Sequence, residues 1–386
     1  MISKAANANM TREPGCAVGG SAAACRRRNP EEEWNSAPGC CARPRRLAMA
    51  AVWIAFWSIL VGHPFTPASA AEFLLPEDGT IVGDVRVLTV ESDATLYDIA
   101  RHYDLGFEEI TRSNPDVNMW VPGRGRRIIV PTEFILPPRP WTGIVINLSA
   151  RRLYYFPKPP RGQRGTVVTF PIGIGRLDWP TPLGNTRIID KVRNPSWVVP
   201  RAILKEHELM GDPLPPVVPP GPNNPMGLLA LETGFPEVFI HGTNEPWGVG
   251  GLVSHGCIHL YPEDVASVFD KISVGTPVRI IDQPELVGER GGVLFMAAFG
   301  AVDPVDDAPK AANRAVAAVV SHLGDRTAAI DWNRVRATAQ LETTVLTPIT
   351  LSTFDFWELA PDIPAQPYTI PAYGPDANAA APPAAP

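Results

Sequence analysis

The chain has 386 residues, enough for two modest domains with further segments at its ends. Its 44 prolines are more than twice the usual share, which predicts many turns and extended connections. The formal net charge is −6, yet residues 1–46 carry eight basic and four acidic side chains, so the remainder is more acidic still. An acidic chain argues against nucleic acid as the partner, because phosphate binding requires a basic face.

The N-terminal residues have the composition of a leader followed by an export signal. Residues 1–42 are of low complexity and contain no pattern from which a core is expected, and an early start codon would explain them equally well. Residues 43–70 combine three arginines with the apolar run Leu47–Val61 and the small residues Ala68-Ser69-Ala70, which predicts cleavage before Ala71. An uncleaved membrane anchor is the alternative, although the run is shorter than the ~20 residues of a span.

Cysteine usage is informative. Four of the five cysteines precede the predicted cleavage site, so that only Cys257 would remain in the exported protein. A lone cysteine cannot form an internal disulfide, and it is therefore buried and inert, intermolecular, or a reactive thiol. Its sequence neighbours have to decide between these possibilities.

Residues 84–131 form a compact unit in the order strand, helix, helix, strand. Short β-branched runs predict the two strands, and apolar residues recur at helical spacing between them. The predicted elements are a strand over 85–90, a helix from Leu96 to Tyr103 capped by Asp93 or Thr95, a helix from Phe107 to Asn114-Pro115, and a strand Arg127–Val130.

The stretch TLYDIARHYDLGFEEITRSNPDVNMWVPGRGRRIIVP resembles a LysM module over this whole unit. The resemblance implies binding to the N-acetylglucosamine of glycan strands. Trp120 is then either a sugar-stacking side chain or part of the core. A small packing domain without sugar affinity is the alternative.

Residues 132–140 are rich in proline and are expected to be a linker to a second domain at 141–285. Many short strands and one main helix, Pro262–Ile272, predict a mostly β fold, a sandwich or barrel. Residues 286–386 are expected to be a C-terminal extension with helices at 308–323 and 330–341 and disorder after about 360. The predicted strands are Ile144–Leu148 and Leu153–Phe156 as a hairpin, then Thr166–Pro171, Thr186–Asp190, Gly227–Glu232, Val238–His241 and Pro277–Ile281.

The stretch Phe239–Leu260 gathers three histidines, several glycines and Cys257. A thiol becomes a good nucleophile as the thiolate, which a nearby imidazole or backbone N–H groups favour. Gly256 allows close backbone approach, so the N–H groups of Gly256 and Cys257 are expected oxyanion donors. Two alternatives remain at this point: a buried, inert cysteine, and a zinc site, because His255, Cys257 and His259 alternate and His241 is a possible fourth ligand.

Ser254-His255-Gly256-Cys257-Ile258, preceded by His241-Gly242-Thr243-Asn244, resembles the YkuD-type L,D-transpeptidase catalytic domain. The likeness extends to Thr181-Pro182-Leu183-Gly184, Asn194-Pro195-Ser196-Trp197 and the stretch 219–227, and it runs from about Trp141 to Asp282. It implies Cys257 as nucleophile and His241 as proton donor and acceptor, with Ser254, His255 and Gly256 lining the site. His259 stands where the family usually has arginine or asparagine, and it is an expected substrate contact together with Asn244 and Trp247.

The resemblance implies a two-step acyl transfer on peptidoglycan in the periplasm, without a metal or organic cofactor. Cys257 would attack a tetrapeptide stem and release D-Ala, and an amine of a second stem would take the acyl group to give a 3–3 cross-link. Carbapenems would acylate the same cysteine. An outer-membrane lipoprotein as acceptor, water as acceptor (an L,D-carboxypeptidase or cross-link hydrolase), and a non-catalytic wall-binding protein are the alternatives.

Overall fold

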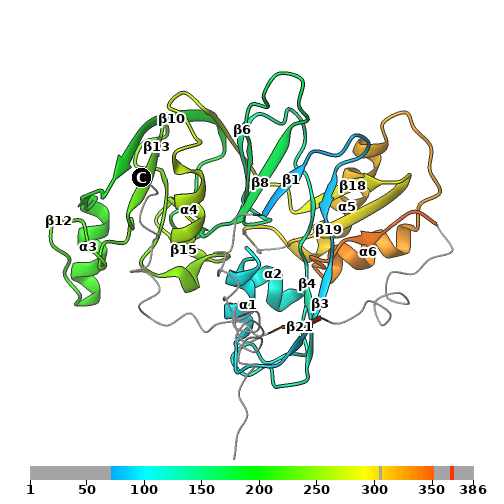
Figure 1. Cartoon of the computed structure of the whole chain (residues 1–386), viewed down its shortest axis with the longest axis horizontal. Helices are drawn as coiled ribbons and strands as arrows, with labels where there is room; N and C mark the ends of the chain where they lie inside the picture. Colours follow the sequence, from blue (N-terminus) through cyan, green and yellow to red (C-terminus); the bar gives the residue numbers. More distant parts are fainter. Residues whose placement is uncertain (1–70, 304–306, 352–365, 369–386) are drawn as a thin grey trace, which may run out of the picture. The chain divides into compact units, whose positions relative to one another are not determined.

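The computed structural model describes residues 71–303, 307–351 and 366–368 (Figure 1). The expected leader at 1–42 and signal peptide at 43–70 lie outside the described residues. Within the described ranges, no helix has both the length and the apolar character that a membrane crossing needs.

The main sheet has nine strands in the order β1-β8-β7-β6-β17-β10-β13-β14-β16, which confirms the mostly β fold. Neighbours are antiparallel except for the pairs β6/β17 and β14/β16, which are parallel. The strands are β1 (Ala71–Leu74), β6 (Gly143–Asn147), β7 (Arg152–Phe156), β8 (Thr166–Pro171), β10 (Gly184–Arg193), β13 (Leu229–Thr233), β14 (Phe239–His241), β16 (Ile258–His259) and β17 (Pro277–Ile281).

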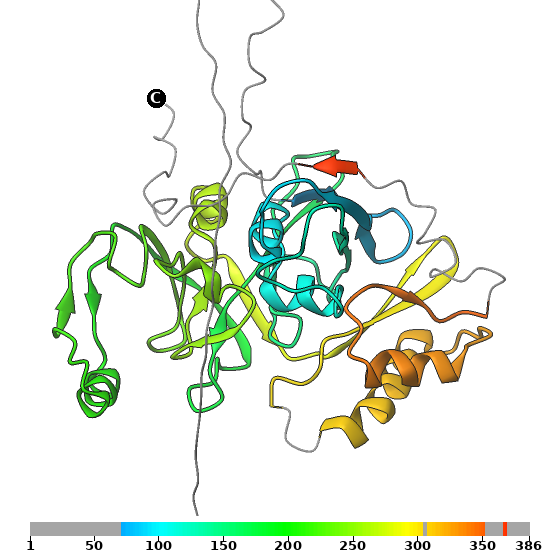
Figure 2. The ribbon, with the colours of Figure 1, turned by 90° about the horizontal axis from the view of Figure 1, so that it is seen from below.

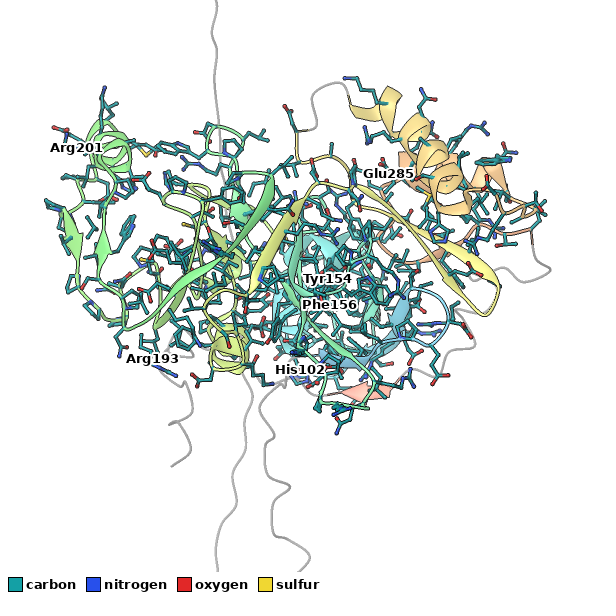
Figure 3. The ribbon with its side chains drawn as sticks, turned by 90° about the horizontal axis from the view of Figure 1, so that it is seen from above. His102, Tyr154, Phe156, Arg193, Arg201 and Glu285 are labelled. Carbon is teal, nitrogen blue, oxygen red and sulfur yellow. The ribbon has the colours of Figure 1, made fainter. Side chains whose placement is uncertain are left out.

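Strands β6 and β7 form the expected hairpin and are buried on both faces. Because side chains alternate along a strand, each face joins a different core. Ile144 and Ile146 belong to the core of the second domain, whereas Val145 packs with the helices of the N-terminal unit. Tyr154 and Phe156 of β7 also point into the core of the N-terminal unit (Figure 3).

The N-terminal unit, residues 84–131, has the predicted order of elements. Thr95 is the N-cap of its first helix: Asp98 N donates to Thr95 Oγ1 at 3.1 Å, and Thr95 N donates to Asp98 Oδ2 at 2.8 Å. This reciprocal capping box satisfies backbone donors at the helix start. The elements are β3 (Arg86–Val90), α1 (Leu96–His102), α2 (Phe107–Arg112) and β4 (Arg127–Val130), with β3 and β4 antiparallel.

The segment 132–140, expected to be a proline-rich linker, contains a strand. Residues Glu133–Ile135 form β5, which pairs with β2 (Ile81–Gly83). Phe134 and Ile135 are buried, and Phe134 joins the same core as Val145. The proline content concealed a short strand, and the two expected domains therefore share a hydrophobic core.

The C-terminal extension contains an antiparallel hairpin of β18 (Glu285–Arg290) and β19 (Val293–Ala298), which the sequence did not predict. The two expected helices are present as α5 (Asp307–Leu323) and α6 (Trp332–Gln340), and they pack with β19 around Val319 and Val335 (Figure 1). The short β20 (Thr347–Pro348) extends this sheet. The disorder expected after about 360 concerns residues that lie outside the described ranges, apart from Gln366–Tyr368, which forms β21, parallel to β3.

The second domain has two helices of eight or more residues instead of one. The expected helix is α4 (Pro262–Phe269), and the additional one is α3 (Arg201–Met210). Helix α3 lies close to the strands β11 (Trp197–Val198) and β12 (Val217–Val218) in both ribbon views (Figures 1 and 2). It buries only Ile203, and it ends at Gly211 with φ 79°.

Candidate active site

The parallel pair β14/β16 brings the histidine and cysteine residues together. Its register places Ile240 opposite Ile258 and His241 opposite His259. Both isoleucines belong to the hydrophobic core. Because side chains alternate between the two faces of a sheet, His241 and His259 lie on the other face, together with Cys257, which precedes His259 by two residues. The predicted nucleophile and base therefore share one face of two adjacent strands.

His241 is buried, with 3% of its surface exposed. Its Nδ1 lies 2.5 Å from the carbonyl oxygen of Gly242, and a carbonyl only accepts hydrogen bonds. Nδ1 therefore carries the proton, which leaves the lone pair on Nε2. Burial lowers the pKa of His241 to about 4, against the opposing effect of hydrogen bonds with the backbone of Gly242 and Met226. At neutral pH the imidazole is uncharged, the form that a general base needs.

The Cys257 thiol donates a hydrogen bond to the carbonyl of Glu237 at 3.4 Å. Part of the residue is accessible to solvent, yet burial of the sulfur raises the pKa of the thiol to about 11. A hydrogen bond with the backbone of Phe239 lowers this pKa, and the carboxylate of Glu237 raises it. The resting state is therefore a neutral thiol beside a neutral imidazole. Among the described residues no hydrogen bond joins Cys257 to His241; diagonal neighbours on adjacent strands lie about 7–8 Å apart at Cα.

The turn before Cys257 is held by its own side chains. Ser254 Oγ donates to the carbonyl of Cys257 at 2.6 Å and accepts from Gly256 N at 3.2 Å. Gly256 has φ 102°, a conformation that residues with a Cβ rarely adopt. The N–H of Gly256, expected to be an oxyanion donor, is engaged by Ser254 in this arrangement. The N–H of Cys257 is the remaining candidate for that role.

Thr181 links this turn to the neighbouring strand through its hydroxyl group. Its hydroxyl donates to the carbonyl of Gly256 and accepts from Gly175 N, each at 3.0 Å, and its side chain is buried. Gly175 ends β9 (Ile174–Gly175), which pairs with β15 (Leu252–Ser254). A Cβ on Gly175 would lie 2.2 Å from the carbonyl oxygen of Trp179, so only glycine permits this close approach.

The His255 side chain faces α3. Its Nε2 lies 2.6 Å from Glu206 Oε2, and Arg176 Nη2 lies 2.6 Å from Glu206 Oε1. The ring of Trp179 meets the His255 ring edge-on at 5.1 Å. The hydrogen bond with His255, followed by that with Arg176, lowers the pKa of Glu206. His255 thus ties α3 to the turn that carries the cysteine.

His259 packs its ring against that of His241, with centroids 4.6 Å apart. Its backbone is fixed by two hydrogen bonds with Gly173, each of 2.9 Å. Burial, and after it the neighbouring His241 and His255, place the pKa of His259 well below its ordinary value. A neutral ring that positions the candidate base therefore stands where the family resemblance led us to expect a charged or amide side chain.

The alternative of a zinc site finds no support in this geometry. No group of three His, Cys, Asp or Glu side chains within residues 71–303, 307–351 and 366–368 has an arrangement that would hold a metal ion. His255 Nε2 faces Glu206, while Cys257 faces the carbonyl of Glu237. The alternation of His255, Cys257 and His259 in sequence does not converge on one point.

Comparisons with known proteins decide the family. The profile described as YkuD, L,D-transpeptidase catalytic domain, matches residues 142–280. Probable L,D-transpeptidase YbiS of Escherichia coli (strain K12) is 42% identical over 221 residues, which are 56% of this chain and 71% of the relative. Probable L,D-transpeptidase YcfS of the same organism is 35% identical over 267 residues, 67% of this chain and 82% of the relative. The chain belongs to the L,D-transpeptidase family.

Among solved structures, L,D-transpeptidase 3 from Mycobacterium tuberculosis is similar at 20% identity and a TM-score of 0.27, over 56% of this chain and 100% of that chain. At that level the assignment of the chain to the L,D-transpeptidases rests on the sequence relatives.

The loop after His241 contacts the N-terminal unit. Phe107 N at the start of α2 donates to the carbonyl of Val249 at 3.2 Å. A Cβ on Gly250 would lie 2.4 Å from Phe107 N, so a glycine is required at this contact. The 3-10 turn Pro246–Gly248 on this loop exposes 61% of Trp247. Trp247 and the half-buried Asn244 remain predicted substrate contacts.

Sequence reasoning missed three residues that hold the candidate site. Thr181 was noted only as part of a motif, and its role as a double hydrogen-bonding partner emerges from the fold. Glu206 and Arg176 come from segments far from Cys257 in sequence. A helix signal for Glu206 was available, because RAILKEHELM consists largely of good helix formers between Pro200 and Gly211.

Proposed function

We propose that this protein is a periplasmic L,D-transpeptidase that cleaves peptidoglycan tetrapeptide stems through a thioester on Cys257, with His241 as its base. The observation that carries the proposal is the parallel pairing of β14 and β16, which places Cys257, the residue directly before β16, next to the strand that carries the neutral imidazole of His241. The family assignment supports the reaction class. The export signal predicted at 43–70 supports the location.

In the first half-reaction the Cys257 sulfur attacks the carbonyl that follows the L-centre of the third stem residue. His241 Nε2 takes the thiol proton as the S–C bond forms, because both groups are neutral at rest. The N–H of Cys257 stabilises the oxyanion. Collapse of the tetrahedral intermediate breaks the C–N bond to the terminal D-Ala, whose amine leaves with the proton from His241.

In the second half-reaction an amine of another stem attacks the thioester. His241, again neutral, removes the proton of the attacking amine and returns it to the departing sulfur, so that the free thiol is restored. The product is a 3–3 cross-link. The ring of His259, packed against that of His241, holds His241 in one orientation through both steps, while Ser254 and Thr181 hold the turn of Gly256 and Cys257.

The N-terminal unit is proposed to bind the glycan strand, as its likeness to LysM modules implies. Trp120 and its neighbour Val121 lie between α2 and β4 with 63% and 71% of their surfaces exposed. An exposed indole does not fill the core, and an aromatic face in this position suits stacking on a sugar ring. Because this unit shares a core with β6 and β7, glycan bound there would lie at a fixed distance from the stem peptide.

The products formed from disaccharide-tetrapeptide by the exported protein, identified by mass spectrometry beside Cys257→Ala, test the proposal. Cross-linked dimers that lack one D-Ala, absent with the variant, are the expected result. Tripeptide alone would identify water as the acceptor, and a tripeptide joined to an added lipoprotein lysine would identify a protein acceptor. An unchanged tetrapeptide with no thioester adduct would refute the catalytic function and favour a wall-binding role.

A further inference from the structure

Two buried carboxyl groups face each other outside the candidate site. Asp104 follows α1 in the N-terminal unit and is 4% exposed, and Asp264 lies in the first turn of α4 and is 2% exposed. Asp104 Oδ1 and Asp264 Oδ2 are buried and accept no hydrogen bond from other groups, and the two carboxyl groups interact with each other. A buried carboxylate without a cation is costly, so this pair needs a physical explanation.

The arginines that reach the pair are already matched by other carboxylates. Arg152 donates to both oxygens of Glu109 at 2.8 and 2.6 Å, and Arg101 donates to both oxygens of Glu263 at 2.6 and 2.9 Å. Each bidentate pair is neutral as a unit. Tyr261, which directly precedes α4, also interacts with Asp264, and burial raises its pKa.

The backbone nitrogen of Ala71 also reaches the pair. It donates to Asp104 Oδ2 at 3.0 Å. Its position is fixed because β1 pairs with β8 in the register Ala71↔Thr169 to Leu74↔Thr166. Ala71 is also the residue before which the small residues Ala68-Ser69-Ala70 predict cleavage by a signal peptidase.

We propose that cleavage of the Ala70–Ala71 bond converts this N–H into an α-ammonium group, which becomes the counter-ion of the buried Asp104–Asp264 pair. The reaction is a hydrolysis by the signal peptidase: water adds, the C–N bond breaks, Ala70 retains a carboxylate, and the new amine of Ala71 takes up a proton. The inference rests on the proposed export of the chain and is independent of the transpeptidase chemistry.

The charges then balance. With the two arginine–glutamate pairs neutral, one proton shared by the two carboxyl groups leaves a single negative charge, which the ammonium neutralises. An α-amino group ordinarily has a pKa of about 8, and a carboxylate at hydrogen-bond distance raises it, so the group is charged at neutral pH. Processing would thus complete the ionic contact between the N-terminal unit and α4.

The pH dependence of stability distinguishes the two states. Burial raises the pKa of Asp104 to about 6 in the chain with a peptide bond at Ala71, and burial raises that of Asp264 further. A folded state that binds more protons than the unfolded state loses stability as the pH rises through the folded pKa. An unprocessed chain is therefore expected to lose stability as the pH rises from about 4, the ordinary pKa of an aspartate, through about 6, whereas the ammonium of the processed chain lowers these pKa values and removes most of that loss.

The experiment begins with the exported protein, whose N-terminal residue is determined by mass spectrometry and is expected to be Ala71. Its melting temperature is then compared with that of a chain carrying one additional glycine before Ala71, which displaces the ammonium by about 3.4 Å. The addition is expected to lower the melting temperature by about 3–6 °C at pH 7.5 and by less at pH 5. In an Asp104→Asn background the added glycine should not change the melting temperature. In a background of Glu72→Gln, an exposed substitution on β1, the added glycine should lower the melting temperature as much as in the unaltered protein.

A second measurement uses the exported protein without any substitution, so it does not depend on whether a variant folds. In the ¹³C-dimethylated exported protein, NMR titration of the N-terminal group is expected to give a pKa clearly above about 8. An N-terminus other than Ala71, an equal penalty in the Asp104→Asn background, or an α-amino pKa at or below about 8 would each overturn the proposal. None of these outcomes bears on whether Cys257 is the nucleophile.

Discussion

Two regions of this molecule bury ionisable side chains, and they deal with the cost in opposite ways. On the face of β14 and β16, burial leaves His241, His259 and Cys257 neutral. In the charge cluster formed by Arg101, Asp104, Glu109, Arg152, Glu263 and Asp264, the arginines stay charged and are paired at 2.6–2.9 Å. Neutral groups can exchange a proton with a substrate, whereas paired charges fix the packing of the N-terminal unit on the sheet. Substitutions that change the acylation rate are therefore expected to differ from those that change the free energy of unfolding.

The largest expected effect is the loss of the base. His241→Asn removes the proton acceptor while keeping a polar side chain, and it is expected to lower the rate of acylation by a carbapenem by about 10²–10⁴-fold. The melting temperature should change little in comparison. The acylation rate of the unaltered protein should be constant from about pH 5.5 upward and fall only as the pH approaches 4, where the buried imidazole becomes charged and can no longer accept a proton.

An acylation rate that rises around pH 6–7 would contradict this account of His241. Such a profile would mean that the imidazole titrates at its ordinary pKa and that burial does not keep it neutral. His259→Gln tests the positioning ring separately, because it removes the ring packed against His241 and leaves the base in place; it is expected to slow acylation less than His241→Asn does.

The charge cluster is expected to govern stability instead. Arg152→Met leaves Glu109 buried without its partner, and removing one member of a buried pair typically costs about 3–5 kcal/mol in the free energy of unfolding. Urea denaturation measures this loss. Acylation of Cys257 per folded molecule should be unchanged.

The exposed pair Arg124–Asp93, at 3.2 Å, is the control for the buried one. Arg124→Met is expected to change stability by less than about 0.5 kcal/mol, because exposed pairs are screened by solvent. The double variant Arg152→Met/Glu109→Gln should recover part of the loss. Equal effects of Arg152→Met and Arg124→Met would remove the distinction between the two kinds of pair.

A smaller effect, on both properties, is expected at Thr181. Thr181→Val keeps the shape of the side chain but removes its hydrogen bonds with Gly256 O and Gly175 N, which costs about 1–3 kcal/mol for buried partners left unsatisfied. Acylation is expected to slow severalfold because the turn before Cys257 loosens. Thr181→Ser, which retains the hydroxyl, should have nearly the stability and the acylation rate of the unaltered protein. If it does not, the role of Thr181 belongs to its methyl group.

Local patterns in the sequence were sufficient for the elements of the N-terminal unit and for the hairpin of β6 and β7. Their apolar spacing and caps lie within a few residues of each other, and Thr95 indeed caps α1. The structure corrected predictions that depend on distant partners. Residues Glu133–Ile135 pair with Ile81–Gly83. The prolines that follow Ile135 in the sequence gave no indication of that pairing.

The candidate site shows the same limit. The residues of Phe239–Leu260 suggested the chemistry, and the family resemblance assigned roles to Cys257 and His241. The contact of His255 with Glu206 was not predictable, because Glu206 lies 49 residues away in sequence and only the assembled fold brings the two side chains together. The neutral state of His241 and the contact between the rings of His241 and His259 arise from burial and register, which form only when the strands assemble.

The most direct test of the central claim is a mass measurement of the protein after brief incubation with a tetrapeptide stem or a carbapenem, followed by peptide mapping. The account predicts one adduct, located on Cys257, that forms in the unaltered protein, forms far more slowly in His241→Asn and is absent from Cys257→Ala. An adduct on another residue, or one that forms at the same rate without His241, would contradict the assignment of Cys257 as the nucleophile and His241 as its base.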